Sequence, residues 1–394
     1  MSAEGDENYL STAEVARRLQ VKPATIYAYV SRGLLTSVRA RGRRGSLFAA
    51  DEVERLAARS VEHSGVVERI ESELTLLKED ELYYRAHPAR TLATTATPAQ
   101  VAALLWTNTS PERQLARVAE TEVFGVVRGG VELARAGMAV VPEGARLTDR
   151  LRVAVAVLGA ADPLRFDLSP ASVTAAAGRL IGTLVTALPG KTVYGEATLG
   201  ARLWPKLSDD EPRPELLDAA LILLADHGLA VSTVAARVAA SARANLYAVI
   251  SAGLGALDGQ YHGAAPTLAY EFLERAKQDP LTALSDQLRS GKPVPGFGHK
   301  IYQHHDPRAE VLLGLLGDHP ITAIVRAIAE RTPTFPNSDL AIAAIMHAYN
   351  FRPDAGDALF ALARMIGWTA HALEEYAAPP LRFRTMGIYT GQPT

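Results

Sequence analysis

Residues 292–308 carry the sequence KPVPGFGHKIYQHHDPR, which differs from the apolar pattern around it. Two glycines flank Phe297 directly before His299, and Arg308 follows an Asp-Pro pair at the end of the run. Glycines on both sides of an aromatic residue suit a tight loop whose backbone can approach a ligand closely. The histidine can donate a hydrogen bond to a carbonyl group, and the arginine can pair with a carboxylate through two hydrogen bonds. A helix start capped by Asp306 accounts for the end of the run but not for Pro-Gly-Phe-Gly-His.

Three further segments place polar residues where an apolar helix pattern would not. Residues 335–339 (FPNSD) put Asp339 at the start of an apolar helix, where a carboxylate is commonly an N-cap. Residues 258–264 (DGQYHGA) bring His262 next to a glycine, and residues 221–240 contain His227. A histidine at a helix end is most often structural when it is considered alone. None of the three segments therefore identifies a site by itself.

Taken together, these segments resemble the citrate synthase family. The family shares Pro-Gly-[Tyr/Phe]-Gly-His followed nine residues on by the arginine of Asp-Pro-Arg, and residues 295–299 with Arg308 have that spacing. Residues 335–339 resemble its Pro-Asn-x-Asp, and residues 363–371 (ARMIGWTAH) resemble its Ala-Arg-x-x-Gly-Trp-x-Ala-His. The resemblance is clear from about residue 215 to 391 and weaker from 74 to 187.

The resemblance implies condensation of acetyl-CoA with oxaloacetate and water to give citrate and CoA. It makes Asp339 the base that takes a proton from the acyl-CoA methyl group. In the same way, His262 steadies the enolate and His299 polarises the oxaloacetate carbonyl. Because that proton is very weakly acidic, its removal requires a desolvated, well-aimed base and a group that holds the enolate oxygen.

The resemblance also implies the binding residues. Substrate carboxylates would be bound by His227, Arg308, Arg364 and a tail arginine that crosses to the other subunit of a homodimer. Spacing favours Arg384 for this arginine, and the Arg-x-Arg sequence of the tail also permits Arg382. The residues implied for CoA are Val294, Pro295, Gly296, Phe297, Gly298, Lys300 and Asn337. The CoA thioester is a substrate, and we expect no cofactor and no metal, since no metal-ligand spacing is evident.

Several positions depart from the family pattern. Leu224 stands where the first histidine of His-Ala-Asp-His-Glu is expected, and Gly228 replaces the glutamate. Ala230 replaces a frequent asparagine, and Ala265-Pro266 stands where the family has Ala-Asn. These departures leave acyl preference and full turnover open. A 2-methylcitrate synthase that uses propionyl-CoA remains an alternative, because one methylene is worth only about 1–3 kcal/mol in a pocket.

Residues 10–60 have a different character. Residues 10–19 and 24–32 read as two helices separated by a short turn, and residues 34–47 read as a hairpin with a basic tip. About ten Lys and Arg residues stand here against about four Asp and Glu. This segment resembles winged helix-turn-helix modules of the MerR and excisionase type, which implies DNA as a partner. The candidate contacts are Thr25, Tyr27, Tyr29, Arg32, Arg41, Arg43 and Arg44.

Two readings of this module remain open. It is either a small helical appendage with a solvated basic loop, or a DNA-binding module that requires dimerisation for useful affinity. The second reading admits a regulator that senses a CoA ester or oxaloacetate through an inactive synthase fold. Asp339 speaks against that regulator, because sensing alone needs no base.

Length and composition set the remaining expectations. The chain has 394 residues, 48% of them hydrophobic, a net charge of −2 and no cysteine. These values are typical of a globular protein of several domains without disulfides or thiolate metal sites. No apolar run approaches the roughly 18 residues that span a bilayer, and the N-terminus shows no signal pattern, so we expect a cytoplasmic protein.

We predict an all-α fold. The helix-turn-helix module would occupy residues 1–62 and a connector residues 63–97. A large helical domain would comprise residues 98–262 and 361–394, and a small helical domain residues 263–360. Within the large domain, residues 111–137 and 230–254 each show one continuous helical pattern. The active site would lie between the two helical domains.

Overall fold

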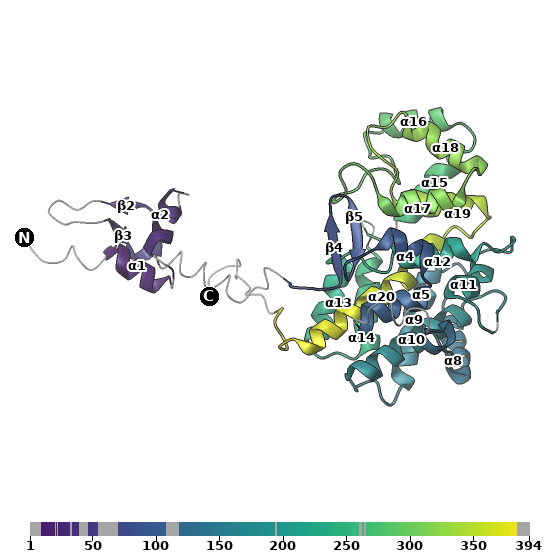
Figure 1. The fold of residues 1–394 in the computed structure, drawn as a ribbon, viewed down its shortest axis with the longest axis horizontal. Helices are drawn as coiled ribbons and strands as arrows, with labels where there is room; N and C mark the ends of the chain where they lie inside the picture. Colours follow the sequence, from purple (N-terminus) through teal and green to yellow (C-terminus); the bar gives the residue numbers. More distant parts are fainter. Residues whose placement is uncertain are drawn as a thin grey trace, which may run out of the picture. The chain divides into compact units, whose positions relative to one another are not determined.

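The computed structural model describes residues 9–19, 21, 23–31, 34–38, 46–53, 70–107, 118–193, 195–259, 262–263 and 265–383. The chain divides into two compact units, one of Met1–Glu71 with Leu381–Thr394 and the other of Ser72–Pro380. Helices make up most of the described residues of the larger unit, which confirms the predicted fold class (Figure 1).

The N-terminal unit contains two helices and a small sheet. Helix α1 (Thr12–Arg18) begins at Ser11, whose hydroxyl and backbone N–H form a capping box with Glu14. Helix α2 spans Pro23–Ser31, so its predicted start is confirmed to within one residue. Strand β3 (Leu47–Ala49) pairs antiparallel with both β1 (Tyr9–Ser11) and β2 (Ser37–Val38).

The core of this unit shows why the two helices and the sheet hold together. Val15, Ile26 and Phe48 are completely buried, and they come from α1, α2 and β3 respectively. The predicted hairpin is present as β2 and β3, whereas β1 was not predicted. The proposed DNA contacts Arg32, Arg41, Arg43 and Arg44 lie outside the described residues.

The larger unit opens with a meander of three short strands: β4 (Thr75–Lys78), β5 (Glu81–Tyr84) and β6 (His87–Pro88). The helices that follow, up to the end of α14, are α4 (Ala89–Thr95), α5 (Pro98–Thr107), α7 (Glu120–Val123), α8 (Arg128–Ala139), α9 (Leu147–Ala161), α10 (Pro170–Ala187), α11 (Leu199–Leu207), α12 (Pro214–Leu223), α13 (Val231–Ser241) and α14 (Leu246–Leu257). Among the described residues, no helix is both long and apolar enough to span a membrane.

The last helices form two groups. In Figure 1 the upper group consists of α15 (Ala265–Ala276), α16 (Pro280–Arg289), α17 (Pro307–Leu316), α18 (Pro320–Ala329) and α19 (Ser338–Ala348). Helix α20 (Ala355–Ala377) returns to the lower group and packs against α5, α10, α12, α13 and α14. Nearly all of its side chains are buried, so it is the central helix of the core.

Two long helical patterns proved wrong as single helices. Residues 230–254 form α13 and α14, because Arg243 adopts a left-handed backbone (φ 60°) and Asn245 caps a new helix. Residues 111–137 do not form one helix either: the described part holds the short α7 and then α8, separated by residues 124–127. In both cases the apolar periodicity continues across the break, which is why the sequence did not reveal it.

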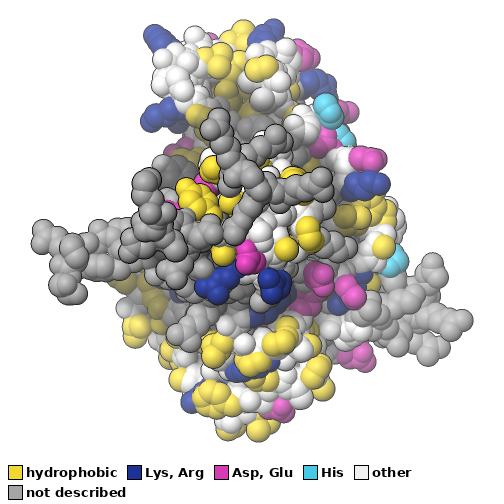
Figure 2. Space-filling model, turned by 90° about the vertical axis from the view of Figure 1, so that its left-hand side faces the viewer, with side chains coloured by type: hydrophobic (Ala, Val, Ile, Leu, Met, Phe, Trp, Pro, Cys, Tyr) yellow, Lys and Arg dark blue, Asp and Glu magenta, His cyan; other side chains and the backbone are white. Residues whose placement is uncertain are grey.

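Charged side chains of both signs are interspersed on the face shown in Figure 2, among patches of hydrophobic side chains. This mixture agrees with the net charge of −2. The described part of this face therefore provides no broad electrostatic attraction for a polyanion.

Candidate active site

A tight loop brings the segments of His299 and Asp339 side by side. Gly296 and Gly298 have φ of 78° and 74°, and a Cβ on Gly296 would lie 2.6 Å from the Leu340 side chain. Gly298 donates a backbone hydrogen bond to Phe335 (2.8 Å), and Asn337 donates one to Gly296 (2.9 Å). Gly296 is therefore required by the close approach of this loop to the start of α19, and Gly298 is favoured by its left-handed backbone.

Asp306 connects the start of α17 to the start of α19. Its carboxylate receives the backbone N–H of Ser338 at 2.9 Å and holds the Arg308 guanidinium through bonds of 2.9 and 2.8 Å. It also caps α17, and both Asp306 and Arg308 are buried. The guanidinium is thereby fixed in place, 5.2 Å from the Tyr302 ring centroid.

His299, His227 and Tyr302 form a cluster. The ring centroids of the two histidines are 5.2 Å apart, and the Tyr302 hydroxyl lies 3.0 Å from His227 Nε2. Burial and the nearby Arg308 lower the pKa of His299 to about 4, and burial with Arg308 and Arg364 lowers the pKa of His227 well below its ordinary value. Both rings are therefore neutral at pH 7.

The tautomer of His299 follows from its contacts. Its Nδ1 accepts the backbone N–H of Ile301 at 3.1 Å. Because a neutral imidazole carries one proton, that proton resides on Nε2. His299 can therefore donate a hydrogen bond to a carbonyl oxygen.

Asp339 lies in the first turn of α19 and is half-buried. Burial raises the pKa of its carboxyl to about 6, while Arg308 and Arg364 act in the opposite direction. A carboxylate with a pKa near the working pH is suited to accept a proton from a weak carbon acid.

His262 and Arg364 complete the cluster. The Ser232 hydroxyl lies 2.8 Å from His262 Nε2, and burial followed by Arg364 lowers the pKa of this histidine. Arg364 is buried, donates through Nε to the Leu224 carbonyl oxygen (3.0 Å), and lies 4.7 Å from the Phe360 ring centroid. Its Nη1 has no hydrogen-bond partner among the described residues. A buried, unpaired guanidinium nitrogen of this kind is suited to an anionic ligand.

The chain was compared with protein families, curated proteins and solved structures. The family model described as the citrate synthase C-terminal domain matches residues 65–384. This chain belongs to the citrate synthase family. A helix-turn-helix domain model matches residues 9–60.

Relatives of both expected specificities were found. The citrate synthase of Mycolicibacterium smegmatis is 28% identical over 347 residues, which cover 80% of this chain and 90% of that protein. The 2-methylcitrate synthase of Mycobacterium tuberculosis is 28% identical over 343 residues, which cover 79% of this chain and 85% of that protein. The citrate synthase of Haloferax volcanii is 35% identical, but the match spans only 53% of that protein and 47% of this chain.

Solved structures agree in fold. The citrate synthase of Thermotoga maritima matches with a TM-score of 0.68 at 24% identity, covering 83% of this chain and 94% of its own. The citrate synthase of Thermoplasma acidophilum, in a ternary complex with carboxymethyl-CoA and oxaloacetate, matches with a TM-score of 0.69 at 24% identity, covering 83% and 95%.

The remaining predicted residues are those for CoA and the tail arginines. Residues 294–298 are half-buried and Lys300 is exposed. Asn337 caps α19 and donates from Nδ2 to the Gly298 carbonyl at 2.9 Å. Arg382 belongs to the other compact unit, where its guanidinium lies 5.3 Å from the Phe383 ring centroid, and Arg384 is outside the described residues.

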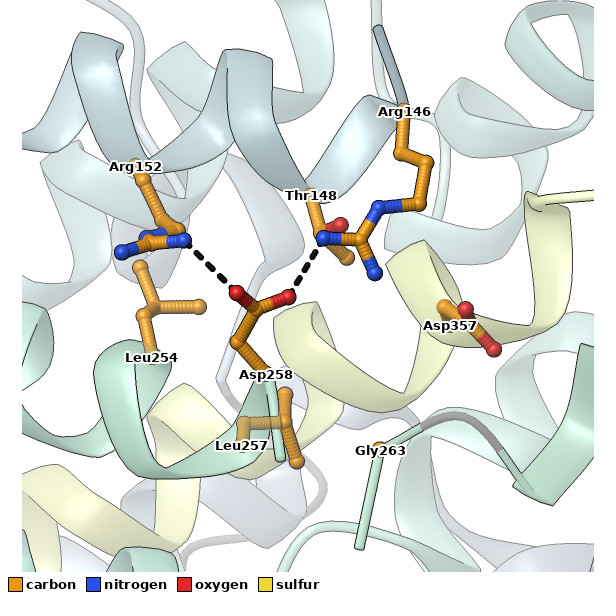
Figure 3. Close-up of a pocket in the computed structure, with 8 residues that line it drawn as sticks. All are labelled: Arg146, Thr148, Arg152, Leu254, Leu257, Asp258, Gly263 and Asp357. Carbon is orange, nitrogen blue, oxygen red and sulfur yellow. Dashed lines mark hydrogen bonds and ion pairs between the residues drawn. The ribbon is translucent and has the colours of Figure 1, made fainter. Parts of the chain in front are cut away.

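Ion pairs at the end of α14 hold the turn that carries His262. Asp258, at the end of α14, forms ion pairs with Arg146 and Arg152, the second at 3.0 Å (Figure 3). His262 then donates its backbone N–H to Gly259 at 2.9 Å. This anchor depends on residues about a hundred positions apart, so no local sequence pattern indicated it.

Two residues that stood in the quoted motifs without an assigned role lie at or beside the cluster. Tyr302 was read only as part of the glycine-containing run, yet its hydroxyl meets His227. His371 lies between Arg237 (2.6 Å) and Asp226 (3.2 Å), and so connects α20 to the residue before His227. Among the described residues, no three His, Asp or Glu side chains are gathered for a metal.

Proposed function

We propose that this protein condenses acetyl-CoA with oxaloacetate and water to give citrate and CoA. The observation that carries this proposal is the pairing of a proton acceptor with a proton donor. Asp339 has a pKa of about 6, and His299 is neutral with its proton on Nε2. The backbone hydrogen bonds between residues 296–298 and residues 335–337 hold the segments of the two residues together. The complex of the Thermoplasma relative with carboxymethyl-CoA and oxaloacetate supports this choice of substrates.

In the proposed reaction, Asp339 removes a proton from the acyl methyl group. We assign the Ser232 hydroxyl as the donor to Nε2 of His262, which places the ring proton on Nδ1, and Nδ1–H then donates to the thioester oxygen and stabilises the enolate. His299 Nε2–H polarises the oxaloacetate carbonyl, the enolate carbon attacks it, and water hydrolyses the resulting citryl-CoA thioester. These steps need no cofactor or metal ion.

The substrate carboxylates are assigned to fixed cations. Arg364 offers the unpaired Nη1, and Arg308 is held by Asp306 beside Tyr302. His227 adds a neutral hydrogen-bonding group. Because these protein groups are already locked in place, their side chains lose little conformational entropy when they bind a dianion.

The direct test measures CoA release with a thiol reagent, which the protein itself does not consume because it has no cysteine. We expect turnover with oxaloacetate and acetyl-CoA that is lost by at least about a hundredfold in Asp339→Ala. Asp318→Ala, which changes an exposed aspartate of the same group of helices, is the control and should retain activity. Equal rates in the two variants would contradict the role of Asp339.

The same assay with propionyl-CoA decides the acyl preference. The curated relatives include a citrate synthase and a 2-methylcitrate synthase at equal identity of 28%. A higher kcat/KM for propionyl-CoA would make the protein a 2-methylcitrate synthase.

A second proposal concerns the N-terminal unit, which matches a helix-turn-helix model. The Tyr27 side chain on α2 is 61% exposed, and Thr25 and Tyr29 lie half-buried on the same helix. We propose that α2 contacts DNA and that the basic residues of the sequence at 39–44 contact phosphates. Binding of duplex DNA that weakens steeply with salt would support this role.

Absence of turnover together with saturable CoA-ester binding would favour a sensing regulator.

A further inference from the structure

The hairpin of β4 and β5 ends in a turn whose two central residues have a left-handed backbone. Glu79 has φ 53° and Asp80 has φ 58°. Such turns are formed most readily by glycine and asparagine. Glycine would fit this backbone better than aspartate, so the role of Asp80 is to be sought in its side chain.

The Asp80 carboxylate binds the backbone of a distant segment. It accepts the N–H of Gln303 on one oxygen and the N–H of His304 on the other, each at 2.7 Å. The pKa of Asp80 is lowered, chiefly by the bond from Gln303, so the group is ionised at neutral pH. The residues that form these two charge-assisted bonds belong to the lining of a hollow of about 400 Å³, which comprises residues 77–80 and 301–305.

The segment that Asp80 binds carries the histidine cluster. Tyr302 directly precedes Gln303, and its ring centroid lies 4.8 Å from that of His299. Its hydroxyl lies 3.0 Å from His227 Nε2. A shift of the backbone at residues 303–304 would therefore displace Tyr302 from both histidines.

The other end of the same hairpin is fixed to the residues before His227. The Thr75 hydroxyl donates to Asp226 at 2.5 Å, and the buried Tyr84 hydroxyl donates to the backbone carbonyl of Asp226 at 3.0 Å. One hairpin thus contacts both the His227 segment and the His299 loop.

We infer that Asp80 is a positioning residue for oxaloacetate: its two backbone hydrogen bonds hold residues 301–304 so that Tyr302 meets both His299 and His227. The inference rests on the proposed function, in which these histidines bind oxaloacetate. Asp80 acts on the oxaloacetate part of the site and leaves the acyl-CoA part unchanged.

The test compares Asp80→Gly with Glu79→Gly in the full chain. Both changes place glycine at a neighbouring position with the same backbone conformation, and only the first removes the acceptors. We expect the KM for oxaloacetate to rise roughly tenfold in Asp80→Gly, with the KM for the acyl-CoA unchanged. Glu79→Gly should behave as the wild type. Asp80→Asn, which keeps one acceptor, should lie between them.

Amide hydrogen exchange tests the two hydrogen bonds of Asp80 without a measurement of turnover. Exchange at Gln303 and His304 should be roughly tenfold faster in Asp80→Gly than in Glu79→Gly. Faster exchange with an unchanged oxaloacetate KM would overturn the positioning role, as would unchanged exchange. A drop in melting temperature with equal rises of both KM values would mean that Asp80 serves general stability only.

Failure of the proposed function is separable from failure of this inference. If the wild type turns over no acyl-CoA, calorimetric titration of oxaloacetate replaces the KM. An oxaloacetate affinity about tenfold weaker in Asp80→Gly would then still support the inference. Equal affinity in the two glycine variants, or no oxaloacetate binding by the wild type, would overturn it.

Discussion

Asp339 and His299 are placed in surroundings that move their pKa values in opposite directions. Burial raises the pKa of Asp339 to about 6 and lowers that of His299 to about 4. A proton acceptor and a neutral proton donor therefore coexist above pH 6. Neither shift is visible in the motifs, because each depends on burial and on arginines from other segments.

The pH dependence of turnover should follow from these values. The base form of Asp339 is lost as the pH falls through about 6, whereas His299 stays neutral until the pH approaches about 4. We expect kcat/KM for the acyl-CoA to fall about tenfold per pH unit below pH 6. A pH–rate profile from pH 4.5 to 8 checks this. An acid limb centred near pH 4 would mean that Asp339 keeps its ordinary pKa.

The raised pKa of Asp339 also has a consequence for stability. Because the folded state binds this proton more tightly than the unfolded chain, ionisation of Asp339 opposes folding. The penalty is absent below the unfolded pKa of 3.8, grows as the pH rises, and is complete above about 6. We expect Asp339→Asn to be inactive yet about 1–2 kcal/mol more stable at pH 7. Urea unfolding at pH 7 and pH 4 checks this, and an equal gain at both values would exclude the electrostatic cause.

At the scale of elements, the packing of α14 on α20 depends on one glycine. A Cβ on Gly253 would lie 2.6–2.8 Å from atoms of the Trp368 ring, whereas a Cβ on Gly255 would meet open space. Gly253→Ala should therefore destabilise the fold by about 1–3 kcal/mol. Gly255→Ala should stabilise it by about 0.5–1 kcal/mol, because alanine favours a helix. Thermal unfolding of the pair checks this, and equal shifts would contradict the close contact.

Asp306 joins α17 to α19 more strongly than a helix cap alone would. It is 1% exposed, caps α17, binds Ser338 and pairs with the buried Arg308. Asp306→Ala should cost about 3–5 kcal/mol, because it leaves a buried guanidinium without its partner. Asp279 is also an N-cap before a proline, but it is exposed, so Asp279→Ala should lower the free energy of unfolding by less than Asp306→Ala does. Chemical denaturation compares the two, and similar losses would reduce Asp306 to an ordinary cap.

At the scale of the whole molecule, the proposed homodimer with a crossing tail arginine has a specific signature. Asp339→Ala and Arg384→Ala homodimers should both be inactive. In a mixed dimer, one site combines an intact Asp339 with the partner's intact tail arginine. Co-refolding of the two variants should therefore restore about a quarter of wild-type activity. Retained activity in the Arg384→Ala homodimer, together with loss of activity in Arg382→Ala and its recovery on co-refolding with Asp339→Ala, would assign the role to Arg382.

Local patterns were sufficient for much of the architecture. The helix start capped by Asp306, the helix start within one residue of Pro23 and the glycine loop before His299 were all readable, because caps and turns involve atoms only a few residues apart. The motif spacings pointed to the same family that the comparisons show. The break at Arg243 was missed, because continuous apolar periodicity concealed it.

Only the tertiary structure decided the protonation states of the site residues and the contacts that position them. The pKa of Asp339, the tautomer of His299, the unpaired nitrogen of Arg364 and the Asp80 contact all arise between residues far apart in sequence. Composition and spacing identify which groups are present. Burial, charge and hydrogen bonding act through distance in space, and they are set only when the helices pack.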